Sequence, residues 1–224
     1  MTVFLKKNSL QSRSAPSTAA ATAILDVAEL LAQTRGYNGF SYADIASRLG
    51  VTKASLHYHF PSKAELGRAL IERYRTLFGA ALEVIDEQAK KAHEKLQQYV
   101  GLYSSVLRNE RMCLCGMLAA EYATLPAPMQ EGLKLFFDAN ERWLTVVLED
   151  GLRAGTFVFR QSANERARVL LGALEGAMLV ARPYGNLRRF QAAAAHLLAD
   201  LGADSHSKQR RTPAKVVMRR RRHT

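Results

Sequence analysis

The spacing of apolar residues along the chain predicts helices over most of its length. The first residues to recur at the three-to-four-residue interval of a helix are Ile24, Val27, Ala28 and Leu31. Similar patterns follow over residues 41–49, 53–59, 63–89, 92–108, 113–124, 127–154, 163–183 and 187–201. Glycine, proline or asparagine separates most of these segments. No run has the two-residue period of a strand, so we expect an all-α fold of about nine helices.

The same pattern divides the chain into four parts. Residues 1–17 are polar and predict a flexible basic arm. Residues 18–75 predict a small three-helix domain, and residues 76–202 predict a larger helical bundle. Residues 203–224 predict a disordered basic tail.

The formal net charge of +12 is concentrated at the two ends of the chain. The segment from His206 to Thr224 has eight lysines and arginines and no acid, whereas residues 76–205 carry a net charge of −1. Such tails favour polyanions such as the DNA backbone. A solvated end without a binding role is the alternative.

Composition argues against several classes of protein. The chain is 48% hydrophobic but has no apolar run of about 18 residues, so no membrane span is expected. Its first residues lack the apolar segment of a secretory signal, and two cysteines fit a reducing compartment, so we expect a cytoplasmic protein. We find no paired nucleophile and base, no glycine-rich phosphate loop and no metal-ligand spacing. The sequence therefore predicts no enzymatic activity, no cofactor and no metal site.

The segment from Phe40 to Lys63 has the layout of a helix-turn-helix unit. Ser41 and Asp44 have the spacing of a capping box, and Ala46 is small enough for two short helices to cross closely. Gly50 suits the left-handed turn between them. The residues expected to fill the junction against the first helix are Ile45, Leu49, Val51 and Leu56. This arrangement leaves the N-terminal half of the second helix free to enter the major groove of DNA.

On these residues, the stretch from about Ile24 to Tyr74 resembles the DNA-binding domain of the TetR/AcrR family of regulators. The matching residues are Gly36-Tyr37, Phe40-Ser41, Asp44-Ile45-Ala46, Leu49-Gly50-Val51, Lys53, Leu56, Tyr58-His59-Phe60-Pro61-Ser62-Lys63 and Glu65-Leu66. His57 departs from the pattern, since many members have tyrosine there, and this bears on operator preference. The resemblance implies a homodimer that binds double-stranded operator DNA at a palindromic or near-palindromic site.

The resemblance and the chemistry of each position predict which residues contact DNA. They are Ser41, Thr52, Lys53, Ala54, Ser55, His57, Tyr58 and Lys63. The four from Thr52 to Ser55 open the recognition helix and are expected to face base edges and flanking phosphates. His57, Tyr58 and Lys63 are expected to hold phosphates, Lys63 together with the free amides of a helix start. A solvated surface position is the alternative for each, whereas Leu56 and Phe60 are expected in the core and His59 in packing.

The second domain is expected to enclose a small-molecule effector among its helices. Candidate lining residues are Tyr99, Leu102, Tyr103, Cys113, Met117, Phe136, Phe137, Trp143 and Met178. Their mixed chemistry indicates a modest apolar or aromatic compound. Ordinary core packing is the alternative for each of them.

The segment from Cys113 to Leu125 resembles one branch of the family, in some members of which this cysteine responds to electrophiles or oxidants. Cys113 follows Arg111 and is expected in the first turn of a helix, and both features lower the pKa of a thiol. Two inert, buried cysteines are the alternative. Cys115 is two residues along and faces another side of a helix, so we expect no disulfide between them.

The last two helices, over about residues 163–201, are expected to form the homodimer interface. Their apolar stripes comprise Leu170, Leu171, Leu174, Ala177, Met178 and Ala181 on one helix, and Ala192 to Ala195 with Leu197-Leu198 on the other. The small residues Gly172, Ala173, Gly176 and Ala177 would allow close approach, and in the family these helices form a four-helix bundle with their mates.

Together these features predict a transcription repressor that is released from its operator by a small-molecule effector or by modification of Cys113. Either event would favour a bundle arrangement that moves the helix starting at Lys63 and changes the spacing of the two recognition helices. A purely structural DNA-binding protein, suggested by the basic tails, is the alternative. The large apolar second domain argues against it.

Overall fold

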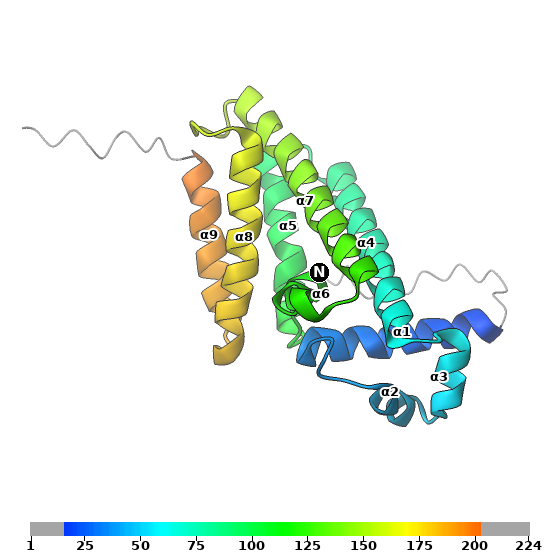
Figure 1. Cartoon of the computed structure of the whole chain (residues 1–224). Helices are drawn as coiled ribbons and strands as arrows, with labels where there is room; N and C mark the ends of the chain where they lie inside the picture. Colours follow the sequence, from blue (N-terminus) through cyan, green and yellow to red (C-terminus); the bar gives the residue numbers. More distant parts are fainter. Residues whose placement is uncertain (1–15, 203–224) are drawn as a thin grey trace, which may run out of the picture.

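Helices account for nearly all of residues 16–202, which are the part of the chain that the computed structural model describes (Figure 1). The N-terminal helices are α1 (Pro16–Arg35), α2 (Tyr42–Leu49), α3 (Lys53–His59) and α4 (Lys63–Gln88). The remaining α-helices are α5 (Ala92–Arg108), α6 (Leu114–Ala120), α7 (Ala127–Arg153), α8 (Ala163–Ala181) and α9 (Leu187–Gly202). Two 3₁₀ turns, η1 (Tyr122–Thr124) and η2 (Arg182–Tyr184), follow α6 and α8. The all-α prediction is thus confirmed for these residues. The basic arm lies almost entirely, and the basic tail entirely, outside them.

Local sequence signals begin and end several of these helices. Ser162 caps α8 and its hydroxyl accepts from the backbone N–H of Glu165, whose carboxylate accepts from Ser162 in return. Ser62 caps α4 in the same way through Glu65 N–H. Gly50, at the end of α2, has a φ of 67°, a left-handed conformation that glycine adopts without steric cost.

Two predicted helices end earlier than their patterns indicated. The helix expected over 113–124 stops at Ala120, because Glu121 leaves helical geometry and only a 3₁₀ turn follows before Pro126. The helix expected over 163–183 stops at Ala181, and a 3₁₀ turn containing Pro183 completes the segment. In both places a proline lies close to the end of the helix. Among the described residues, no helix combines the length and the apolar character that a membrane crossing would need.

The helices form a small head joined to a larger bundle (Figure 1). Helices α1, α2 and α3 lie at one end, and α4 rises from the head into the bundle beside α5 and α7. The short α6 lies between the bundle and α1, while α8 and α9 pack side by side. One continuous apolar core extends from Ile24 in α1 to Leu201 in α9, so the head and the bundle share buried packing.

The junction of the head is filled by fewer residues than the sequence predicted. Ile45, Ala46 and Leu56 are buried there, and Leu49 is partly buried. Val51 was expected to plug the same junction, but it is 42% exposed. Its backbone N–H instead closes the end of α2 by donating to Ala46 O at 3.1 Å.

Candidate nucleic-acid interface and effector region

The start of α3 projects from the head with its side chains exposed. Thr52 caps the helix, and its hydroxyl accepts from Ser55 N–H at 3.3 Å. Thr52, Lys53 and Ala54 are exposed and Ser55 is half-buried. Leu56 is fully buried and anchors the opposite face of α3 to the core. The short helix is therefore held by one face while its first turn is open to a partner.

The last turn of α3 carries two exposed aromatic side chains of different character. Tyr58 is 80% exposed, the highest value among the large apolar or aromatic side chains of the described residues. His57 is held in place: its ring lies 4.7 Å from the Tyr42 ring, and its Nδ1 is 3.0 Å from Pro61 O. The Tyr42 hydroxyl in turn donates to Phe60 O at 2.7 Å. Sequence reasoning missed Tyr42, whose aromatic side chain begins α2 in contact with α3.

Lys63 does not have the free ammonium group that the phosphate prediction requires. Its Nζ donates to Tyr37 O at 2.6 Å and to Phe40 O at 2.5 Å, and it lies 4.5 Å from the centroids of both rings. Burial lowers the pKa of this ammonium, and the charges of Glu121 and Asp44 oppose that change. The structure thus corrects the prediction: the side chain braces the loop between α1 and α2, and the α4 amides remain at the surface.

Glu121, at the end of α6, binds the same loop from the other side. Its carboxylate accepts from Tyr37 N–H at 2.6 Å and from Asn38 N–H at 3.3 Å. A Cβ on Gly36 would lie 2.6 Å from Glu121 Oε1, so glycine is needed there for the carboxylate to approach. We name the loop with its two clamps, Glu121 and Lys63, the α6 latch. Sequence reasoning missed it, because only the fold brings these residues together.

A second set of contacts joins the bundle to the end of α1. Arg182, in η2, donates to Thr34 O and, at 3.0 Å, to the Met117 sulfur. Met112 N–H donates to Gln33 O at 3.2 Å. Segments preceding α6 and following α8 therefore both bind α1 directly.

Most of the predicted effector residues belong to a packed aromatic core. The Tyr99 hydroxyl donates to Asn140 Oδ1 at 2.9 Å and lies 3.1 Å from the Tyr103 hydroxyl. Trp143 stacks on Tyr99 with ring centroids 5.4 Å apart, and Phe136 lies edge-on to Phe78. Leu102 and Met178 are buried in the same core. These side chains fill space between helices, as the alternative of ordinary core packing predicts.

Three of the predicted effector residues line cavities: Phe136 borders one between α4 and α7, and the other two share another. Met117 and Phe137 lie in the wall of a cavity of about 370 Å³ between α6, α7 and α8. The rest of its wall includes Met112, Gly116, Ala119, Ala120, Glu141, Arg168, Leu171, Gly172, Glu175, Gly176 and Leu179. We name it the α6 cavity. Its wall reaches Ala120, the residue directly before Glu121 of the α6 latch.

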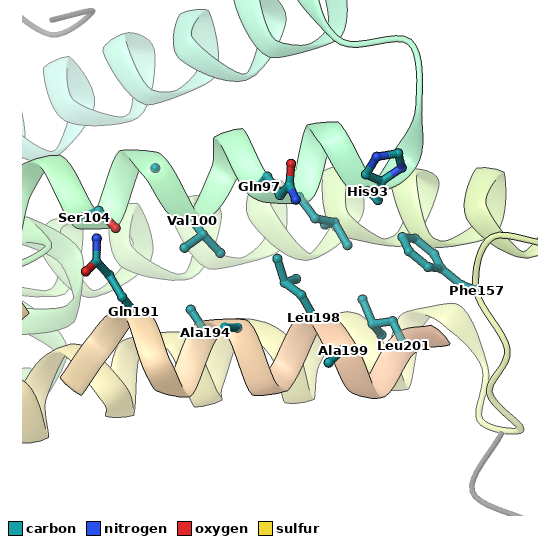
Figure 2. A pocket seen from close by; sticks show the side chains of 13 residues that line it. His93, Gln97, Val100, Ser104, Phe157, Gln191, Ala194, Leu198, Ala199 and Leu201 are labelled. Atoms are coloured by element: carbon teal, nitrogen blue, oxygen red, sulfur yellow. The ribbon is translucent and has the colours of Figure 1, made fainter. Parts of the chain in front are cut away.

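A separate groove of about 510 Å³ runs between α5 and α9 (Figure 2). Ser104 and Gln191 face each other at one end, and His93 and Phe157 lie at the other. Val100 and Leu198 line its middle. None of the predicted effector residues lines it, because its lining looks like the ordinary apolar face of two amphipathic helices, whereas Ala194, Ala195 and Leu198 belong to the stripe predicted for the dimer interface.

Cys113 is buried rather than poised for reaction, which corrects the prediction of a lowered pKa. It caps α6 without entering its first turn, is 1% exposed, and its neighbours include Glu175 and Tyr74. Burial raises the pKa of the Cys113 thiol well above its usual range, and the charge of Glu175 adds to that rise. Cys115 is likewise buried, its pKa raised by burial, and both thiols are free. Within residues 16–202, no three His, Cys, Asp or Glu side chains are grouped to hold a metal ion.

Glu175 is a half-buried charge that sequence reasoning overlooked. It accepts hydrogen bonds from Cys113 and Tyr103, whereas its Oε1 is buried and has no hydrogen-bond partner among the described residues. Burial raises the pKa of Glu175 to about 7, and the two hydrogen bonds oppose that rise. A Cβ on Gly116 would collide with its carboxylate. A lone acid within the apolar run 170–181 was the available signal.

The outer face of α8 is apolar and exposed, but it is not the face that the sequence indicated. Leu170, Leu171, Leu174, Met178 and Ala181 are buried within the chain itself, since α8 packs on α7 and α9. The exposed apolar residues are Val169 at 56%, Leu179 at 56% and Val180 at 61%. Gly172 and Gly176 are exposed beside them, and a Cβ added at either would have no other residue within 4 Å among those described.

Comparisons with known proteins agree with this architecture. Residues 24–70 match the family of bacterial regulatory proteins of the tetR type. A TetR-family transcriptional regulator from Agrobacterium tumefaciens superposes with a TM-score of 0.81 at 33% identity, over 84% of this chain and 100% of that one. A TetR transcriptional regulator from Legionella pneumophila gives 0.73 at 34% identity, over 80% and 95%. The nucleoid occlusion factor SlmA of Photobacterium profundum is 27% identical over 68% of this chain and 78% of its own length.

Proposed function

The chain belongs to the TetR family of DNA-binding transcriptional regulators, and from that premise we propose that it is a repressor released from its operator by a small-molecule effector. One observation carries the proposal. Leu56 anchors α3 to the core and leaves its first turn exposed, while α6 both lines a cavity and ends at Glu121, which binds the loop between α1 and α2 in the same head. We further propose that the protein works in the cytoplasm, where operator DNA is found.

The proposed DNA surface is the exposed side of the head. Thr52, Lys53, Ala54 and Ser55 would face base edges and flanking phosphates from the first turn of α3. Tyr58 would donate its hydroxyl to a phosphate, His57 would lie beside it against the DNA backbone, and Ser41 would contribute at the start of α2. At α4, the backbone amides following Ser62 would take the phosphate role first assigned to the Lys63 side chain.

The proposed homodimer uses the outer face of α8, together with α9. Val169, Leu179 and Val180 form an apolar strip that one chain leaves open to water. Glycine in an exposed helix costs about 1 kcal/mol relative to alanine, and neither Gly172 nor Gly176 is required by packing within the chain. Close approach of a second copy explains both the strip and the glycines. Two heads related by that axis would read the two halves of a palindromic operator.

The proposed effector site is the α6 cavity. Its volume and its apolar wall with a few polar groups suit a small organic molecule. A ligand that displaces the α6 wall would also displace Glu121 and so loosen the α6 latch. The head would then lose its fixed angle to the bundle, and the two copies of α3 would no longer match the groove spacing.

Selection of DNA from a random-sequence pool by the purified full-length protein tests the operator proposal. We expect a palindromic consensus, protected in a footprint over two major grooves on one face of the duplex. Tyr58→Ala should weaken binding to that consensus by about tenfold, the loss of one phosphate contact. Tyr122→Ala, which removes an exposed tyrosine outside the proposed surface, should leave it unchanged. Absence of any consensus at low salt would contradict the proposal.

A thermal-shift screen of small organic molecules tests the effector proposal. A true effector should stabilise the protein and release it from the selected DNA. Val146→Ala, at an exposed position of α7 outside the α6 cavity, should preserve both effects, whereas Met117→Trp, which fills the α6 cavity, should abolish them. A stabilising compound that leaves DNA affinity unchanged would contradict the proposed coupling.

A further inference from the structure

The hydrogen bond at His57 fixes which of its ring nitrogens carries a proton. Pro61 O lies 3.0 Å from Nδ1, and a carbonyl oxygen only accepts, so Nδ1 must be the donor. The ring is also held by the face of Tyr42, 4.7 Å away. In the neutral side chain the other nitrogen, Nε2, therefore has a lone pair and no hydrogen.

That lone pair is the wrong group for a phosphate. His57 is exposed on the last turn of α3, next to Tyr58. In a helix-turn-helix unit the N-terminal residues of the recognition helix reach base edges, which leaves its later turns closer to the backbone. Phosphate oxygens are acceptors, so a neutral Nε2 offers them no hydrogen bond. Protonation converts Nε2 into a charged donor.

We propose that each subunit takes up a proton at His57 Nε2 when it binds operator DNA, so that operator affinity rises as the pH falls through the neutral range. The inference rests on the proposed operator-binding function and adds a regulatory role for one residue of that surface. Tyr42 and the Pro61 carbonyl are the positioning groups: Tyr42 holds the ring, the carbonyl keeps the hydrogen on Nδ1, and Nε2 is the nitrogen that would face the DNA.

The other titratable groups of this part of the head lie on α2, α3 and α4. From α2, the Tyr42 phenol stays neutral, because burial raises its pKa to about 12. Glu65, from the first turn of α4, acts on that phenol through its charge. On α3 itself, Lys53 lies one turn earlier and His59 packs edge-on against Tyr58, with ring centroids 5.1 Å apart. The control variant therefore substitutes His59, the other histidine of α3.

The test measures affinity for the selected consensus duplex at constant ionic strength between about pH 6 and about pH 8. One linked proton changes affinity by at most about tenfold per pH unit, so two subunits should give the wild-type dimer a loss of about ten- to a hundredfold over this range. His57→Gln places a donor at the same position that does not titrate, and its affinity should vary much less with pH. His59→Gln should retain the wild-type dependence.

A second measurement needs no DNA. Nitrogen-15 NMR of the free protein at about pH 8 should show His57 as the Nδ1–H tautomer, and Tyr42→Ala should weaken that preference. A selected consensus with equal pH dependence in wild type and His57→Gln would overturn the inference and leave the operator proposal standing. An Nε2–H tautomer would overturn it as well. Failure to select any consensus at either pH would contradict both the inference and the operator proposal.

Discussion

At the scale of single residues, three half-buried charged side chains away from the exposed face of α3 are held by specific partners. Lys63 and Glu121 hold the carbonyls and amides of the loop between α1 and α2. Glu175 lies deeper, against Cys113 and Tyr103. Charges removed from water are costly unless they are paired or protonated, so substitution of each of these residues should change the free energy of unfolding measurably.

The pKa of Glu175 predicts a pH dependence of stability with a definite sign. The folded-state pKa is about 7, whereas the unfolded chain ionises near the ordinary value of 4.5. Between these values the folded state holds more protons, so the free energy of unfolding falls as the pH rises, by about 3 kcal/mol in total. Urea denaturation from about pH 5 to about pH 8 should show this fall in wild type relative to Glu175→Gln. Parallel curves for the two proteins would contradict it.

Burial of Cys113 and Cys115 predicts slow thiol chemistry. Both thiols are out of reach of solvent, and burial raises the pKa of each, so the thiolate is scarce. A water-soluble alkylating reagent at neutral pH should label neither cysteine in the folded protein and both after denaturation, as mass spectrometry would show. Rapid labelling of folded Cys113 would restore the electrophile-sensor hypothesis.

At the scale of elements, α6 connects the α6 cavity to the head. Its residues line the α6 cavity, and the residue that follows it, Glu121, binds Tyr37 N–H and Asn38 N–H. The helix has only seven residues, so a displacement of the α6 residues that line the cavity also moves the C-terminal end of the helix. The early end of α6, which its apolar pattern did not predict, is what turns Glu121 toward the head.

Loss of the Glu121 carboxylate should loosen the loop it holds. In Glu121→Ala, hydrogen exchange at the Tyr37 and Asn38 amides should speed up by at least about tenfold, because two donors lose a charged acceptor worth about 1–3 kcal/mol. Operator affinity should fall with it. Glu131→Ala, which removes an exposed carboxylate of α7, serves as the control and should change neither quantity.

At the scale of the whole molecule, the proposed activity requires two copies. A single head presents one α3, and the outer face of α8 leaves Val169, Leu179 and Val180 exposed to water. Burial of apolar surface contributes about 25 cal/mol per Å², so a second copy would recover what one chain leaves open. The near-neutral bundle presents little charge repulsion to such pairing.

A charge in the middle of the α8 strip should separate the copies without unfolding them. Leu179→Glu places a carboxylate at a position that is 56% exposed in one chain, so the fold should survive while the dimer dissociates. Sedimentation should show a monomer, and affinity for the palindromic consensus should fall by at least about a hundredfold, since one head binds one half-site. Val146→Glu on α7 is the matched control. A stable Leu179→Glu dimer would place the interface elsewhere.

The local features of this protein follow from its amino-acid sequence. The capping box at Ser41, the left-handed turn at Gly50 and the apolar spacing of each helix depend on residues a few positions apart, and the structure has them as predicted. Membership of the recognised family rested on the same kind of local pattern. Apolar positions also marked most of the core, because burial follows from side-chain chemistry, although Val51 is exposed.

The fold, by contrast, sets every feature that depends on packing between distant segments. It placed Lys63 on backbone carbonyls, Glu121 on the head and Glu175 beside Cys113, and it chose which face of α8 lies inside the chain. A helical period shows that a stripe is buried but not which neighbour covers it. A pKa likewise depends on burial and on nearby charge, so the raised pKa of Cys113 could not be read from Arg111 and a helix start alone.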